Sequence, residues 1–157
     1  PLVDSAIIKH NNKYWLIGSL SDERKGYELH VFYSDSLLGS YQPHQSNPIR
    51  SGLDGIRSAG DFIQVDDCIY RPSQNCENEY GESITINKIT QLDETKVSEE
   101  FYMKISINRR NKLNHNMRTI HTINALGNII TLDGKLYSYA PLYKFMKFLR
   151  GIKTHLL

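Results

Sequence analysis

The chain is poor in the residues that mark several large protein classes. Its 157 residues include two cysteines, Cys68 and Cys76, which are too few for a disulfide framework. Neither has a histidine or cysteine neighbour at metal-ligand spacing, so we expect no metal site. No apolar run reaches the roughly 20 residues that a membrane span needs, and no signal-peptide pattern is present. We therefore expect no membrane span and a cytoplasmic location.

The chain also has little excess of one charge over the other. The formal net charge is +2 at pH 7, too small for the basic footprint of a nucleic-acid-binding protein. The excess basic residues lie in the last third, where a solvated face explains them. No nucleophile elbow, phosphate-binding loop or dinucleotide fingerprint occurs, and we expect no cofactor and no nucleic-acid partner.

What the sequence does contain is a pattern that returns about every 55 residues. A short apolar run, a small polar turn and an aromatic-ended run occupy residues 6–16 and recur at 61–71, with a weaker copy at 121–132. Hairpin repeats of this length predict the blades of a β-propeller. Propellers gather their innermost strands around one axis, and a ligand usually binds there.

The pattern predicts one all-β domain over residues 1–157. We expect a first blade at about 3–50, a second at 51–108 and a partial third at 119–139. The expected strands lie at 5–9, 14–19, 28–34, 60–64, 68–71, 83–89, 100–107, 121–124, 129–132 and 135–139. Hairpin turns are predicted at Asn11-Asn12 and Asp133-Gly134, and a polar loop at 72–81.

Beyond residue 140 the apolar spacing changes to that of a helix, and we expect a short C-terminal helix at 141–150. The blade count stays between two and three, whereas a closed propeller needs at least four. Either the chain is the C-terminal part of a larger propeller, or another copy covers its open edges. The second case predicts self-association through the blade edges.

Alignment of the repeated hairpins by their turns places Asp4 opposite Ala59, two residues after Arg57, and places His121 nearby in the third unit. Asp4, Arg57 and His121 all lead into predicted innermost strands. A carboxylate, a guanidinium and an imidazole around one pocket suit a polyhydroxylated or phosphorylated ligand. The structural alternatives are a capping or turn residue at Asp4 and a hydrogen-bonded structural histidine at His121.

A second cluster spans residues 70–76 and 80–82. It combines Arg71, Gln74 and Tyr80 with a further amide and a carboxylate. In a loop, these groups could bind sugar hydroxyls while Tyr80 stacks on a sugar face. The alternative is a turn network that satisfies its own hydrogen bonds, in which Gly81 only permits a positive φ angle.

These residues also carry a family resemblance. Residues 30–41 and 44–49, then 56–60, 70–76 and 80–81, resemble the N-terminal domain family of glucosamine inositolphosphorylceramide transferases. The shared motifs are arginine-x-alanine-glycine, tyrosine-arginine-proline-x-glutamine-x-cysteine and tyrosine-glycine, and the resemblance covers about residues 1–139. It implies the C-terminal blades of a five-bladed propeller, of the type found in arabinanases, xylosidases and fructosidases. It also implies a sugar or sugar-nucleotide ligand, and it marks Arg57, Arg71, Gln74 and Tyr80 as motif positions. Asp61 stands where the family often has a basic residue.

Three functions follow as hypotheses. The first is a carbohydrate-recognition module of a glycan or polysaccharide biosynthesis protein, which binds a sugar or sugar phosphate. Its binding residues would be Arg57, Arg71, Gln74, Tyr80 and His121, with Asp4 completing the pocket. The second is a glycoside hydrolase-like enzyme in which Asp4 transfers a proton, which requires a second carboxyl group such as Asp61 or Glu82. The third is a structural module that binds a partner through an open sheet edge.

Overall fold

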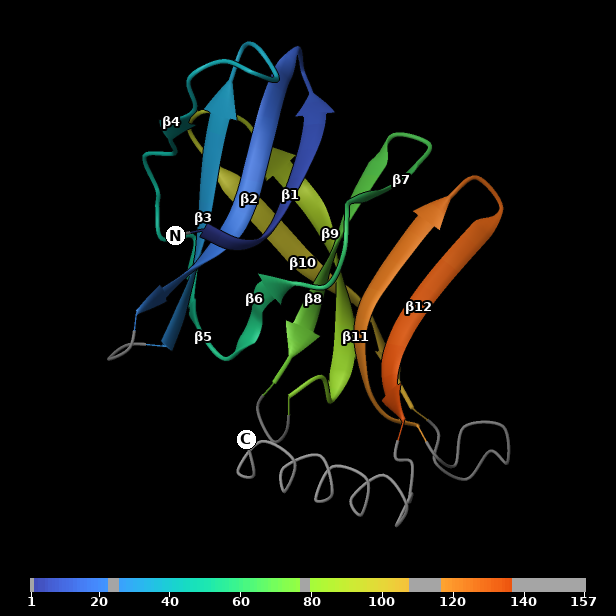
Figure 1. Cartoon of the computed structure of the whole chain (residues 1–157). Coiled ribbons are helices and arrows are strands. Elements are labelled where there is room, and N and C mark those ends of the chain that lie inside the picture. The colour runs from blue at the N-terminus through green and yellow to red at the C-terminus, as the bar shows by residue number, and fades with distance from the viewer. Residues whose placement is uncertain (1, 23–25, 77–79, 108–116, 137–157) are drawn as a thin grey trace, which may run out of the picture.

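The computed structural model describes residues 2–22, 26–76, 80–107 and 117–136. The described residues form twelve β-strands in three antiparallel sheets and contain no α-helix. The all-β prediction is therefore confirmed. The helix expected at 141–150 lies outside the described residues. Figure 1 shows the first sheet in blue, the second in green and yellow, and the third as an orange hairpin.

The first sheet is a meander in the order β1 (Leu2–His10), β2 (Lys13–Asp22) and β3 (Gly26–Ser34). Two short strands, β4 (Gln42–Pro43) and β5 (Arg50–Gly52), pair with the outer edge of β3. Asn11 and Asn12 join β1 to β2 with φ angles of 49° and 60°. Two consecutive positive φ angles are what a two-residue hairpin turn requires, which confirms the predicted turn.

The second sheet repeats this arrangement with a broken first strand. Both β6 (Asp54–Ser58) and β7 (Ile63–Val65) pair with β8 (Cys68–Asn75), which is followed by β9 (Ser83–Leu92) and β10 (Val97–Ser106). The predicted strand at 60–64 is wrong at its start, because the chain leaves the edge of β8 between β6 and β7.

The predicted loop at 72–81 is also wrong at its start, since residues 72–75 continue β8 and are buried. A proline is tolerated there for a local reason. The carbonyl of Pro72 accepts a hydrogen bond from the Ala59 amide, at 3.0 Å. In a strand the N–H and C=O of one residue point to the same side. The N–H that Pro72 lacks would therefore face the break between β6 and β7, where the ladder is already interrupted.

The third sheet comprises β11 (Met117–Leu126) and β12 (Ile129–Leu136), joined by a turn at Gly127 and Asn128. The turn predicted at Asp133-Gly134 is wrong, because both residues lie inside β12 and pair with Thr122 and Ile120. The expected strand at 135–139 extends beyond the described residues.

The three sheets pack face to face. One core cluster joins the first sheet to the second through Trp15, Ile17 and Val31 on one side and Ile56 and Ile69 on the other. A second cluster joins the second sheet to the third. It is formed by Ala59, Ile84, Ile86, Ile120 and Ile123. The second sheet is thus covered on both faces, and β1 of the first sheet contacts β6 of the second.

Backbone hydrogen bonds hold the third sheet close to the second. The Ile123 amide donates to the Ala59 carbonyl at 2.8 Å, and the Ile120 amide donates to the Gly81 carbonyl at 2.9 Å. A Cβ at Gly60 would lie 2.0 Å from the Ile123 carbonyl oxygen, and one at Gly81 would lie 2.9 Å from that of Ile120. Both glycines also have positive φ angles. Glycine at these two positions is what lets the third sheet approach the second.

Candidate functional site

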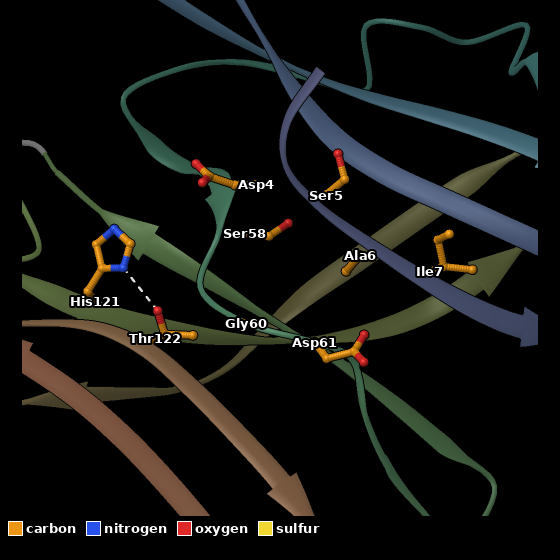
Figure 2. A pocket seen from close by; sticks show the side chains of 9 residues that line it. All are labelled: Asp4, Ser5, Ala6, Ile7, Ser58, Gly60, Asp61, His121 and Thr122. Carbon is orange, nitrogen blue, oxygen red and sulfur yellow. Dashed lines mark hydrogen bonds between the residues drawn. The ribbon is translucent and has the colours of Figure 1, made fainter. Parts of the chain in front are cut away.

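A pocket of about 510 Å³ opens where the three sheets meet (Figure 2). β1 supplies its upper wall, the end of β6 and the segment after it supply the floor, and β11 supplies the remaining side. The lining residues are Asp4, Ser5, Ala6, Ile7, Ser58, Gly60, Asp61, His121 and Thr122. Distant stretches of sequence therefore contribute to one cavity.

Each of the three strands is irregular where it reaches the pocket. On β1, Asp4 and Ser5 together oppose one residue of β2, and Asp4 has a φ angle of 50°. On β6 the register shifts between Asp54 and Ser58. On β11, His121 is the extra residue between the paired residues Ile120 and Thr122. Bulges turn side chains out of the regular alternation and are frequent beside functional sites.

Arg57 is held at the rim of the pocket by charge and by two aromatic rings. Its Nε donates to Oδ2 of Asp4 at 2.6 Å. The guanidinium lies over the rings of Tyr27 and Tyr80, 5.2 Å from each centroid. Burial opposes the charged form, but the hydrogen bond and the charge of Asp4 outweigh it and raise the pKa of Arg57. The side chain is therefore a fixed, permanent cation.

His121 extends this network to the other side. The hydroxyl of Tyr80 hydrogen-bonds to Nε2 of His121, and the Gln74 amide nitrogen lies 3.4 Å from the same atom. With Nε2 accepting, Nδ1 carries the ring proton and donates to Oγ1 of Thr122 at 2.9 Å. The Gln74 amide also donates to the Ser58 carbonyl at 3.0 Å. Five of the six predicted site residues thus form one connected network.

Arg71 is the predicted site residue that lies apart from the others. It is 1% exposed, and its Nε and Nη2 donate hydrogen bonds to the Glu99 carboxylate at 2.8 and 2.7 Å. Nη2 also donates to the Gly55 carbonyl at 2.7 Å. Because residues three apart on a strand point to opposite faces, Arg71 and Gln74 cannot serve one pocket once β8 extends through both. In this structure Arg71 joins β8 to β10.

Three hydroxyl residues of the lining, Ser5, Ser58 and Thr122, were not predicted, because a single serine or threonine in a strand carries no signal of its own. Asp61, considered there as a carboxyl group for catalysis, lies in the pocket lining, whereas Glu82 does not. Within the described ranges, no group of three or more His, Cys, Asp or Glu residues could hold a metal ion. The same part of the chain has no helix with the length and apolarity that a bilayer crossing requires.

Comparison with known proteins agrees with the resemblance. The family model for "Glucosamine inositolphosphorylceramide transferase 1, N-terminal" matches residues 1–131. The chain belongs to this family. A relative named glucosamine inositolphosphorylceramide transferase 1 from Arabidopsis thaliana is 38% identical over 112 residues, and one of the same name from Oryza sativa subsp. japonica is 33% identical over 113. These matches cover 68% and 69% of the chain but 14% of each relative. No solved structure matches the chain.

The family motifs noted above have distinct structural positions. Arg57 and Tyr80 face each other at the pocket rim. Gly60 and Gly81 lie against the backbone of β11. Arg71 lies in the interior of the second sheet. The motifs therefore gather mainly at the junction of the sheets and not on one loop.

Proposed function

We propose that this chain is a carbohydrate-recognition module of a glycan-biosynthesis protein, and that the pocket between the three sheets is its sugar site. The observation that carries the proposal is that Asp4 and His121 line one cavity and that Arg57 and Tyr80, from two further segments, connect them in one network of contacts. Carboxylate oxygens accept hydrogen bonds from sugar hydroxyls, and protein hydroxyls both donate and accept them. The names of the relatives, which are glucosamine transferases of inositolphosphorylceramide, support a role in glycan assembly.

We further propose that the three sheets are blades of a propeller of the five-bladed glycosidase type. Two features support this. The first two sheets have the same meander order from an irregular inner strand outward, and neighbouring sheets pack face to face. The blade boundaries and the cytoplasmic location given above remain predictions.

The test is binding on a glycan array followed by titration of the best ligand. Tyr102 provides a matched control for Tyr80. The two tyrosines are 56% and 54% exposed, but Tyr102 packs on Tyr70, whereas Tyr80 contacts Arg57. Tyr80→Ala should weaken binding about tenfold through lost stacking and a disordered Arg57, while Tyr102→Ala should leave it unchanged. An array without any bound glycan, or equal losses in both variants, would overturn the proposal.

A glycoside hydrolase-like activity is the second candidate, because two carboxyl groups, Asp4 and Asp61, line the same pocket. It predicts release of the aryl group from aryl glycosides, lost in Asp4→Asn while sugar binding survives. Binding without release by the wild-type protein would exclude hydrolysis of these substrates.

A docking function is favoured by one other feature. The β11–β12 hairpin exposes a group of apolar side chains, Leu126, Ile129, Ile130 and Leu132. If this surface joins two copies of the chain, sedimentation should show a dimer that Ile130→Lys converts to a monomer. A monomeric wild-type protein at high concentration would exclude self-association.

A further inference from the structure

The pocket lining is rich in acceptors and has little positive charge. It contains two carboxylates and three hydroxyls, with neither lysine nor arginine among its lining residues. Arg57 at the rim neutralises Asp4. Asp61 has no ion-pair partner among the residues that the structure describes. One uncompensated carboxylate therefore faces the cavity.

Asp61 is also fixed in position. Its Oδ1 accepts a hydrogen bond from the Phe62 amide at 2.9 Å, and its own amide donates to Oδ1 of Asn124 at 2.9 Å. The segment is held further by Gly60, which packs against the backbone of β11. These contacts leave Oδ2 of Asp61 available on an anchored side chain.

Ser58 gives an independent indication of a ligand. The residue is 5% exposed, and its Oγ has no hydrogen-bond partner in the described structure. Figure 2 shows its hydroxyl directed into the pocket, between the Asp4 and Asp61 ends. A buried hydroxyl without a partner costs stability, so a ligand hydroxyl that pairs with it would remove that cost.

We propose that the pocket takes an uncharged polyhydroxylated ligand, with Ser58 and Asp61 as its hydrogen-bond partners, and that it rejects the phosphorylated form of the same sugar. This inference rests on the sugar site proposed above and narrows the class of ligand. A carboxylate binds a pair of sugar hydroxyls by charge-assisted hydrogen bonds. A phosphate group would place −1.5 to −2 charges beside the same carboxylate at pH 7, and like charges within one cavity repel.

The first experiment measures charge selectivity. Saturation-transfer NMR titrations compare glucose, galactose and mannose with their 6-phosphates on the wild-type chain. For the sugar that binds, we expect the affinity to exceed that of its 6-phosphate by about tenfold or more. Asp61→Asn should bring that ratio towards one. Glu100→Gln removes the same charge from an exposed position on β10 and should leave the ratio unchanged.

The second experiment uses two buried serines. Ser83 Oγ also lacks a partner and its residue is fully buried, but Ser83 does not line the pocket. Both Ser58→Ala and Ser83→Ala should melt at or above the wild-type temperature, because each removes an unpaired buried hydroxyl. Only Ser58→Ala should lose sugar affinity, by about fivefold to tenfold.

The outcomes separate the two proposals. Equal or tighter binding of the 6-phosphates to the wild-type chain would overturn the present inference and leave the sugar site standing. Unchanged affinity in Ser58→Ala, or unchanged selectivity in Asp61→Asn, would also overturn it. Failure of every probe and of the glycan array to bind would overturn the proposed function, and this inference with it.

Discussion

Alanine at Gly60 should detach the third sheet from the second. The new Cβ would lie 2.0 Å from the Ile123 carbonyl oxygen and 3.0 Å from Oδ1 of Asn124, and the φ angle of 119° is strained for any residue with a Cβ. The clash is with backbone, so it cannot be relieved by rotation of a side chain. The β11 strand must move away instead.

The expected cost has two parts. Backbone strain at such a φ angle is about 1–3 kcal/mol. The movement also breaks the bonds from Ile123 to Ala59 and from Asp61 to Asn124, each worth about 0.5–1.5 kcal/mol. Together these terms lower the free energy of unfolding by about 2–6 kcal/mol.

Gly52 provides the control. Its φ angle is 134°, close to that of Gly60, but a Cβ there would meet nothing within 4 Å. Gly52→Ala therefore measures the strain alone, and the difference between the two variants measures the clash and the lost bonds. Urea denaturation can be followed by the fluorescence of Trp15, the single tryptophan, which is 1% exposed in the first sheet.

Hydrogen exchange then locates the effect. In Gly60→Ala the Ile123 amide should exchange much faster, whereas amides of β2 and β3 should exchange faster only as far as global stability falls. In Gly52→Ala the Ile123 amide should show no such local change. Equal destabilisation by both substitutions, with Ile123 still protected, would refute the idea that Gly60 is required for the approach of β11.

Two further predictions concern charge. Glu99→Gln should lower the free energy of unfolding by about 3–5 kcal/mol, because it leaves the Arg71 guanidinium buried without its counterion; a loss below about 1 kcal/mol in urea denaturation would contradict that role. Hydrogen bonds from Thr95, Gln91 and Lys96 hold the pKa of Asp93 well below its usual range. The depressed value stabilises the folded state above about pH 4, and the effect is lost as the pH falls through the lowered pKa. Asp93→Asn should thus have a lower free energy of unfolding than the wild type at pH 7, and the difference should close in acid. A difference that does not change with pH would contradict a stabilising role for the ionised Asp93 carboxylate.

The hairpin of β1 and β2 could be predicted because its signals are local, whereas the turn expected at Asp133-Gly134 lies inside β12. The Asn11-Asn12 turn and the alternating runs of β1, β2 and β3 are visible in the sequence itself, and the structure has them where they were expected. The sequence repeat also led to the prediction that Asp4 and His121 lie near one another, and both residues line the same pocket.

The interior of the second sheet could not be predicted in this way. The polar residues at 73–75 suggested a loop, yet they are buried in β8, and Ser73 is hydrogen-bonded to the neighbouring strand. The Asn87 amide donates to Oγ of Ser73 at 2.8 Å, and that hydroxyl donates to the Thr85 carbonyl at 3.2 Å. Such pairing depends on strand neighbours that a single sequence does not reveal. The same limit applies to Arg71, whose partner Glu99 lies two strands away.

The positions of the motif residues connect the proposed ligand binding to folding. Gly60 and Gly81 let β11 approach, and only that approach places His121 against Tyr80 and Gln74. The pocket is therefore assembled by the packing of the third sheet and is not carried by any one sheet. Linkage makes this coupling reciprocal. The free energy by which a bound ligand stabilises the contact between the second and third sheets equals the free energy by which that contact strengthens ligand binding. Substitution of either glycine should then weaken binding through the position of β11, even where every side chain that touches the ligand is kept.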